Sequence, residues 1–352
     1  MERKLKIAQL VPPWIPVPPK AYGGIERVVY YLTEGLTSRG HEVTLFASGD
    51  SQTSARLISP FLEALGNIGE LKNNPTLQLL QVSPCFEMAG EFDIIHSHMV
   101  YQAAFFANLV KTPVVHTLHG SFIKGEVPEE RRRLLEKYKN QNFVSISFAQ
   151  REGLPDLNFV ANIYNGVNID EFEYGEGGGY LSWLGRITPK KGVVEAIEVA
   201  RILGKKLKIA AFIDPIDQPF FEMRVKPLID GQQIELVGEL KGTAKSDFLK
   251  ASLALLFPID WHEPFGIVMI EAMACGTPVV AFDRGSVSEV VVSGKTGFVV
   301  DPNLGVDGLV EAVKKIDQID RLACRRHVEE NFSVKKMIDR YEEAYKKILA
   351  KQ

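Results

Sequence analysis

The chain has 352 residues, and because a single hydrophobic core stops growing at roughly 250–300 residues, this length predicts two domains. Hydrophobic residues make up 45% and charged residues 24%, as in an ordinary globular protein, and the net charge of −3 argues against a dedicated nucleic-acid binder. The three cysteines are far apart, and no segment has the ~20 apolar residues of a membrane span or the apolar run of a secretory signal, so we expect a cytoplasmic protein without disulfides.

Strands and helices alternate along the first half of the chain. Strands are predicted at residues 6–11, 41–47, 92–98, 113–120, 143–146 and 159–163. Helices are predicted at about residues 25–39, 101–110 and 129–139, whereas the stretch 51–84 shows only a helical pattern around residues 61–65. Such alternation is typical of an α/β fold with a doubly wound parallel sheet.

Two places in this half carry residues suited to ligand binding. A proline-rich loop after the first strand ends at Gly23 and Gly24, where glycine and a helix start could cradle a phosphate; a flexible loop explains the same residues. His119 ends the fourth strand, at the carboxyl edge where open α/β sheets bind ligands, and it either contacts a substrate or caps the strand. His96 and His98 share a strand face, but without a third ligand they do not indicate a metal site.

The helix at residues 129–139 carries many cations on its outer face. A solvated face is the expected explanation, and contact with an anionic acceptor or a peripheral membrane contact is the alternative.

The second half opens with a glycine-rich stretch, residues 173–179, which is predicted to be a linker. Further strands at 180–184, 207–213, 234–237 and 254–257, with helices between them, indicate a second parallel sheet. The loop after the first of these strands contains Arg186 and Lys191 and leads into a helix. An arginine fork, a lysine point charge and a helix N-terminus together suit a diphosphate, although an ordinary basic loop has the same composition.

The stretch 258–280 contains a helix that buries a carboxylate. The helix is predicted from about Phe265 to Gly276, because Pro264 suits a helix entrance and Gly276 suits a left-handed C-terminal cap. Every residue from 265 to 275 is apolar or glycine except Glu271, so we expect this carboxylate to be buried. It then needs a partner, such as the hydroxyls of a ligand or a core arginine, unless the helix is only half covered.

Glu263 lies just before this helix. The free backbone N–H groups of Phe265, Gly266 and Ile267 are expected to face an anion or a sugar oxygen there.

The run Glu263-Pro-Phe-Gly-Ile-Val, followed by Glu271-Ala-Met-Ala-Cys-Gly-Thr-Pro-Val-Val, resembles the two-glutamate motif of the family-4 retaining glycosyltransferases, the glycosyl transferases group 1. The resemblance covers nearly the whole chain. It implies the GT-B fold, in which two Rossmann-like, doubly wound parallel-sheet domains face each other across a cleft. The expected domains are an acceptor-side domain at residues 1–169 and a nucleotide-sugar-binding domain at 170–332, with a C-terminal helix at 333–352 that packs back on the first domain.

The resemblance also implies an activity. We expect a retaining, metal-independent transfer of a hexose from a nucleotide-diphosphate sugar, with UDP favoured and GDP-mannose next, to an unidentified glycan, lipid or small molecule. No cofactor and no metal are expected, and the oligomeric state stays open. A nucleotide-sugar epimerase or hydrolase on the same fold and a non-catalytic, two-lobed sugar-binding protein are the alternatives.

The resemblance assigns roles to individual residues. The catalytic set it implies is His119 and Glu263 at the transferred sugar, with Arg186 and Lys191 at the diphosphate. The donor-binding set it implies is Gly23, Gly24, Arg186, Lys191, Glu239, Leu240, Glu263, Phe265, Gly266, Ile267 and Glu271, with Glu271 at the ribose and Glu239 and Leu240 bordering the base. Two stretches depart from the family pattern. Asp260-Trp261-His262 before Glu263 leaves the sugar preference open, and Gly285-Ser286 in place of two glycines leaves the donor or acceptor contacts there open.

Overall fold

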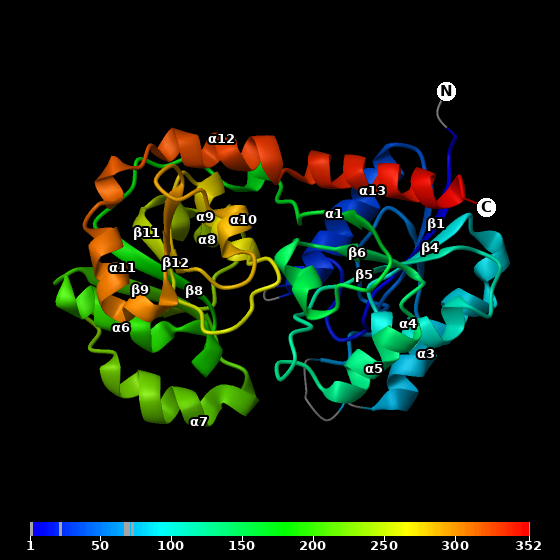
Figure 1. Ribbon diagram of the computed structural model, residues 1–352, viewed down its shortest axis with the longest axis horizontal. Helices are drawn as coiled ribbons and strands as arrows, with labels where there is room; N and C mark the ends of the chain where they lie inside the picture. Colours follow the sequence, from blue (N-terminus) through cyan, green and yellow to red (C-terminus); the bar gives the residue numbers. More distant parts are fainter. Residues whose placement is uncertain (1–2, 21–22, 67–70, 72–73, 352) are drawn as a thin grey trace. The chain divides into compact units, whose positions relative to one another are not determined.

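The structure, a computed structural model, describes residues 3–20, 23–66, 71 and 74–351. The chain divides into two compact units: unit 1 comprises residues 1–166 and 334–352, and unit 2 comprises residues 167–333. Each unit is a parallel sheet with helices on both faces, which confirms the predicted α/β class (Figure 1). None of the helices in the described part of the chain is long and apolar enough to cross a membrane.

The sheet of unit 1 has seven strands in the order β3-β2-β1-β4-β5-β6-β7, and every neighbouring pair is parallel. The strands are β1 Lys6–Leu10, β2 Glu42–Phe46, β3 Arg56–Ile58, β4 Ile94–Ser97, β5 Val114–Thr117, β6 Asn142–Ser145 and β7 Phe159–Asn162. Sequence analysis predicted all of them except β3, which is an edge strand of three residues and too short to show a pattern.

In the part of unit 1 that the structure describes, the helices cover the sheet on its two faces. They are α1 Gly24–Ser38, α3 Pro75–Glu87, α4 Val100–Ala107, α5 Glu129–Lys137 and α13 Val334–Leu349. Helices α1 and α13 pack on one face, whereas α3, α4 and α5 pack against one another on the other.

One helix in this unit was missed and one prediction was wrong. The missed helix is α3, whose N-cap Asn74 accepts a hydrogen bond from the backbone N–H of Thr76 (2.9 Å). Residues 61–65 form bends and irregular loop rather than a helix. Their backbone groups bond elsewhere: the carbonyl of Phe61 accepts from Gly49 N–H (2.9 Å), and the N–H of Ala64 donates to Asp50 (2.9 Å).

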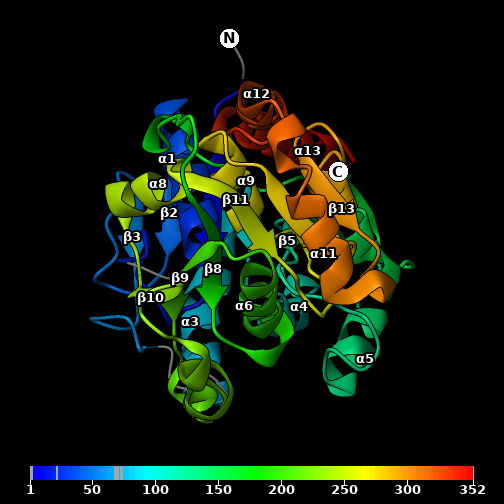
Figure 2. The same cartoon turned by 90° about the vertical axis from the view of Figure 1, so that its left-hand side faces the viewer.

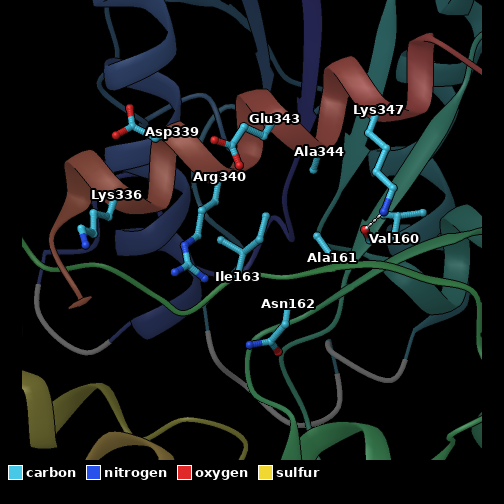
Figure 3. Close-up of a pocket in the computed structure, with 10 residues that line it drawn as sticks. All are labelled: Val160, Ala161, Asn162, Ile163, Lys336, Asp339, Arg340, Glu343, Ala344 and Lys347. Carbon is cyan, nitrogen blue, oxygen red and sulfur yellow. Dashed lines mark hydrogen bonds between the residues drawn. The ribbon is translucent and has the colours of Figure 1, made fainter. Parts of the chain in front are cut away.

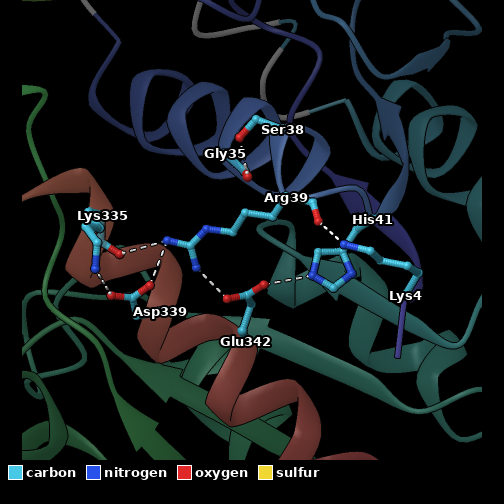
Figure 4. A network of polar contacts seen from close by, with 8 residues as sticks. All are labelled: Lys4, Gly35, Ser38, Arg39, His41, Lys335, Asp339 and Glu342. Carbon is cyan, nitrogen blue, oxygen red and sulfur yellow. Dashed lines mark hydrogen bonds and ion pairs between the residues drawn. The ribbon is translucent and has the colours of Figure 1, made fainter. Parts of the chain in front are cut away.

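Ion pairs and an apolar stripe hold α13 against unit 1. Met337, Tyr341 and Tyr345 recur at helical spacing and are buried. On the polar side Glu342 pairs with Arg39 and with His41, the latter at 2.8 Å (Figure 4). The helix therefore packs on unit 1 through one buried face and is part of that unit.

A groove with a volume of about 540 Å³ runs between α13 and the edge strand β7 (Figure 3). Lys347 closes part of it by donating to the carbonyl of Val160 (3.0 Å). None of the residues expected to bind a ligand lines this groove.

The sheet of unit 2 has six parallel strands in the order β10-β9-β8-β11-β12-β13 (Figure 2). The strands are β8 Tyr180–Arg186, β9 Lys206–Phe212, β10 Ile234–Gly238, β11 Ser252–Phe257, β12 Val279–Phe282 and β13 Gly297–Val300. The helices are α6 Val193–Ile202, α7 Gln218–Phe220, α8 Gly242–Lys250, α9 Ile267–Ala274, α10 Val287–Val290, α11 Gly305–Val313 and α12 Arg321–Asn331. Helices α6 and α11 pack on one face, and α8 and α9, with α12 outside them, pack on the other.

The glycine-rich stretch 173–179, which was predicted to be a linker, lies inside unit 2. The N–H of Gly175 donates to the carbonyl of Cys275 (3.1 Å), and the Gly175 carbonyl accepts from Arg321 (2.8 Å). These bonds tie the stretch to the body of the unit. The chain passes between the units at Gly166–Val167 and again at Ser333–Val334.

Candidate functional site

The strand order of unit 2 reverses between its two central strands. The chain winds outward through β8, β9 and β10 on one side and through β11, β12 and β13 on the other. In open α/β sheets, ligands bind at the carboxyl edge of such a switch point. Arg186 ends β8, and the segment from Pro258 to Glu263 follows β11, so the basic loop and the glutamate motif both start at this edge.

The basic loop is pressed against the segment that follows β11. Gly192, the N-cap of α6, has φ 70°, and a Cβ atom there would lie 1.8 Å from the carbonyl oxygen of Pro258. The backbone N–H of Asp260 donates to the carbonyl of Lys190 (2.8 Å). Only glycine fits at 192, and the close approach fixes the loop relative to the glutamate motif.

Lys191 and Glu263 form an ion pair beside aromatic rings. Nζ of Lys191 lies 2.7 Å from Oε2 of Glu263, and the indole N–H of Trp261 donates to the same oxygen (3.1 Å). The ammonium also lies 4.7 Å from the centre of the Trp261 ring and 5.9 Å from that of Phe257, within cation–π range. Within the described part of the chain, the second oxygen of Glu263 accepts no hydrogen bond. That oxygen is available to a ligand.

The backbone of Glu263 is held from the other side by the loop after β12. The N–H of Ser286 donates to the carbonyl of Glu263 (2.9 Å), and a Cβ at Gly285 would lie 2.3 Å from that carbonyl oxygen. Of the Gly285-Ser286 pair, the first position therefore needs glycine and the second accepts a side chain. The departure from two glycines is compatible with the packing here.

Glu271 lies on α9, which begins at Ile267 and is capped by Gly266 in the left-handed conformation (φ 74°). The carboxylate is buried, as predicted, and it is paired with a lysine rather than with an arginine: Oε1 contacts Nζ of Lys245, which projects from α8. The ammonium of Lys245 also lies 5.5 Å from the centre of the Phe172 ring. Lys245 was not singled out from the sequence, because it lies on another helix in a stretch without a motif.

Arg186 is occupied by two carboxylates. Its Nε and Nη2 atoms each lie 2.6 Å from Oδ2 of Asp217, and its Nη1 lies 3.4 Å from Oδ2 of Asp214. Both aspartates follow β9, the strand next to β8. Neither aspartate belongs to a motif in the sequence; their position directly after a strand of the same sheet is the signal that could have identified them. A diphosphate would have to exchange with these carboxylates.

The remaining donor-binding candidates differ in what they can offer. Phe265 is buried and packs edge-on against Phe332 with ring centres 5.9 Å apart, so only its backbone can contact a ligand. Glu239 and Leu240 follow β10, the edge strand, and are separated from the central strand β8 by β9.

Gly23, Gly24 and His119 belong to unit 1. Gly24 is the first residue of α1, with Gly23 as its N-cap, as expected for a helix start after the first strand. His119 follows β5, and its Nε2 lies 2.8 Å from Nδ1 of His98. Among the described residues, no group of three or more His, Cys, Asp and Glu side chains could hold a metal ion.

The basic helix α5 uses part of its charge inside the unit. Arg132 donates to the carbonyls of Phe122 and Gly153, the latter at 2.8 Å. Arg131 lies 4.8 Å from the centre of the Tyr101 ring. Arg131, Arg133 and Lys137 are exposed, and Nε of Arg133 lies 3.8 Å from Oε1 of Glu129.

Comparison with known sequences matches both halves of the chain to one group of proteins. Residues 22–171 match the family described as "Glycosyltransferase Family 4", and residues 170–331 match "Glycosyl transferases group 1". The glycogen synthase of Mycobacterium tuberculosis is 25% identical over 88% of this chain and 86% of its own. The phosphatidyl-myo-inositol mannosyltransferase of Mycolicibacterium smegmatis is 26% identical over 85% of this chain and 82% of its own.

Solved structures share the fold. Sucrose-phosphate synthase from Thermosynechococcus elongatus superimposes with a TM-score of 0.81 at 20% identity, covering 99% of this chain and 100% of that one. Anabaena HepE in complex with UDP-glucose superimposes with a TM-score of 0.76 at 18% identity, covering 97% of this chain and 100% of that one.

Proposed function

Since the chain is a glycosyltransferase of family 4, with the GT-B fold, we propose that it transfers a hexose from a nucleoside-diphosphate sugar to an acceptor, with retention of anomeric configuration and without a metal ion. The observation that carries this proposal is the arrangement at the switch point of unit 2. There, the loop after β8, which carries Arg186 and Lys191, lies against the segment after β11, and Lys191 pairs with Glu263 at 2.7 Å.

The cations and a helix dipole suit the diphosphate. When the bond between the sugar and the diphosphate breaks, negative charge grows on the leaving group, and donors that are already in place lower the barrier. Arg186 can bridge two phosphate oxygens, Lys191 supplies a point charge, and the N-terminus of α6 directly after Gly192 adds a dipole of the same sign. Asp214, Asp217 and Glu263 hold the side chains of Arg186 and Lys191 in place for this exchange.

The two glutamates suit hydroxyl groups. Glu263 has one oxygen held by Lys191 and Trp261, which leaves the other to accept from a sugar hydroxyl. Glu271 has one oxygen held by Lys245, and we assign its other oxygen to the ribose. The backbone N–H groups at the start of α9 are further donors for the sugar. His119, in unit 1, is assigned to the transferred sugar.

UDP is the favoured nucleotide, and GDP-mannose is the next donor to try. A structural neighbour of this chain was solved with UDP-glucose, and sequence relatives include mannosyltransferases. The relatives' names point to different acceptors, a glucan and an inositol lipid, so the acceptor class stays open among glycans, lipids and small molecules.

The test is incubation of the protein with UDP-, GDP- and ADP-sugars and a panel of acceptors, followed by mass analysis. A glycosylated acceptor together with free nucleoside diphosphate supports the proposal. An altered free sugar would instead show an epimerase or a hydrolase, and an unchanged donor that still raises the melting temperature would show a non-catalytic binder.

A further inference from the structure

Three neighbouring strands of unit 1 bring polar side chains to one face of the sheet. The register pairs Gln9 of β1 with His96 of β4, and His96 with Val115 of β5. Because side chains alternate along a strand, every second residue on each of these strands shares that face. The residues concerned are Gln9, His96, His98, Thr117 and His119. The strand order of unit 1 reverses between β1 and β4, so this face lies at the second switch point of the chain.

A row of hydrogen bonds starts at His119. Its Nε2 lies 2.8 Å from Nδ1 of His98, and Nε2 of His98 lies 3.2 Å from the carbonyl oxygen Oε1 of Gln9. Since Oε1 can only accept, the proton of neutral His98 is on Nε2 and its Nδ1 must accept. His119 must therefore donate from Nε2. Its own Nδ1 then carries a lone pair and has no partner in the described part of the chain.

The same row continues to α13. The amide of Gln9 donates to the hydroxyl of Tyr345 (3.2 Å), which lies 2.7 Å from Nδ1 of His96. Nε2 of His96 lies 2.7 Å from the hydroxyl of Thr117, and that hydroxyl lies 3.1 Å from the hydroxyl of Tyr341. All these hydrogen bonds form together when Tyr345 donates to Nδ1 of His96 and His96 donates from Nε2 to Thr117. Each group in the row then donates to the next group along from His119.

We propose that Gln9, His98 and Tyr345 are positioning residues that hold His119 as the neutral tautomer protonated on Nε2, so that Nδ1 accepts a hydrogen bond from a hydroxyl of the transferred sugar. The inference rests on the proposed function, in which His119 contacts that sugar. A free imidazole exchanges easily between its two tautomers. Here, moving the proton of His119 from Nε2 to Nδ1 requires His98 to change its tautomer and the amide of Gln9 to flip. The flip would break the hydrogen bond from the Gln9 amide to the buried hydroxyl of Tyr345.

The electrostatics of the row agree with neutral rings. Burial lowers the pKa of His96 and His98 well below the usual value, and it lowers the pKa of His119 to about 4. A proton on Nδ1 of His98 would face the N–H of His119, so a charged His98 would break the row. His119 is accordingly a hydrogen-bond acceptor at neutral pH and not an acid.

The direct test is NMR of the protein labelled with ¹⁵N at histidine. Long-range ¹H–¹⁵N spectra distinguish protonated from unprotonated ring nitrogens without any need for turnover. We expect His119 to be protonated on Nε2 in the parent, and to become a mixture of tautomers in Gln9→Leu and Tyr345→Phe. The matched control is Gln81→Leu. Gln81 is a buried glutamine of the same unit that bonds the carbonyls of Val11 and Phe46, outside the row, and its loss should leave His119 unchanged.

Kinetics supply the second readout. Gln9→Leu should lower kcat several-fold and leave the affinity for UDP unchanged. In a His119→Ala background it should have no further effect on kcat, because residues that act through one another are not additive. Additive losses would overturn the positioning role, as would a proton on Nδ1 of His119 in an active parent. If no donor is turned over while the tautomer is as expected, the proposed function fails and the structural inference stands.

Discussion

At the scale of single residues, the candidate donor site consists of charges that already have partners. Lys191 is held by Glu263, and Arg186 is held by Asp214 and Asp217. A charge held in this way is ordered before the ligand arrives, so less side-chain entropy is lost on binding. The diphosphate must displace these carboxylates. The measured affinity is therefore the free energy of the new contacts with the diphosphate minus that of the ion pairs that are lost.

Arg186→Ala and Lys191→Ala should each lower kcat by about a hundredfold to a thousandfold, which is the usual loss for one preorganised donor to a developing anion. Arg186→Lys should not restore the rate, because a point charge cannot bridge two phosphate oxygens. Lys190→Ala is the matched control, since Lys190 is the adjacent cation and its side chain is exposed. Steady-state kinetics with saturating donor measure the effect, and equal rates in Lys191→Ala and Lys190→Ala would refute the role of Lys191.

Lys245→Met should destabilise unit 2 by about 3–5 kcal/mol, because it leaves the buried carboxylate of Glu271 without its ion-pair partner. The double variant Lys245→Met with Glu271→Gln should recover most of this loss, since neither buried charge remains. Urea unfolding of the four proteins gives the coupling free energy. A double variant as unstable as Lys245→Met alone would show that lost packing, and not the unpaired carboxylate, causes the effect.

At the scale of elements, helix and strand periodicity predicted most strands of both sheets, and the missed elements are short or interrupted. The edge strand β3 has three residues, β13 has four and α3 contains Pro84, so none of them shows a clear period. The same limit applies to the site. Lys191 and Glu263 were predicted as site residues from local motifs. Their pairing depends on β8 lying next to β11, and a local sequence pattern does not predict which strands are neighbours in the sheet. The partners Lys245, Asp214 and Asp217 lie outside any motif and become visible only when the elements pack.

The histidines of unit 1 should make its stability depend on pH. His116, on the opposite face of β5 from His119, is fully buried, and burial lowers its pKa to about 4. In the unfolded chain a histidine has a pKa of about 6.5, so between these values the unfolded state binds a proton that the folded state does not. The stability from His116 is complete above pH ~6.5 and falls by about 1.4 kcal/mol per pH unit as the pH drops towards 4.

His116→Leu should therefore flatten the dependence of the unfolding free energy on pH between roughly 4.5 and 6. Urea titrations at several pH values measure it. The same slope in the parent and in the variant would mean that His116 is not the titrating group.

At the scale of the whole molecule, we expect unit 2 to bind the nucleotide and unit 1 to contribute His119 to the reaction. The candidates for the nucleotide are mostly in unit 2, and His119 is in unit 1. His119→Ala should therefore lower kcat while the affinity for UDP, measured by calorimetry, stays within a factor of about two, a change of under 0.5 kcal/mol. A large loss of UDP affinity would place His119 at the nucleotide instead.

The central claim is that unit 2 binds a nucleoside diphosphate through its own cations and glutamates, and calorimetric titration of UDP into chelator-treated protein tests it most directly. The account predicts saturable binding without metal, weakened about tenfold to a hundredfold in Glu271→Gln, because a charge-assisted hydrogen bond of about 1.5–3 kcal/mol to the ribose is lost. Binding that appears only after magnesium or manganese is restored, or binding that is equally tight in Glu271→Gln, would contradict it.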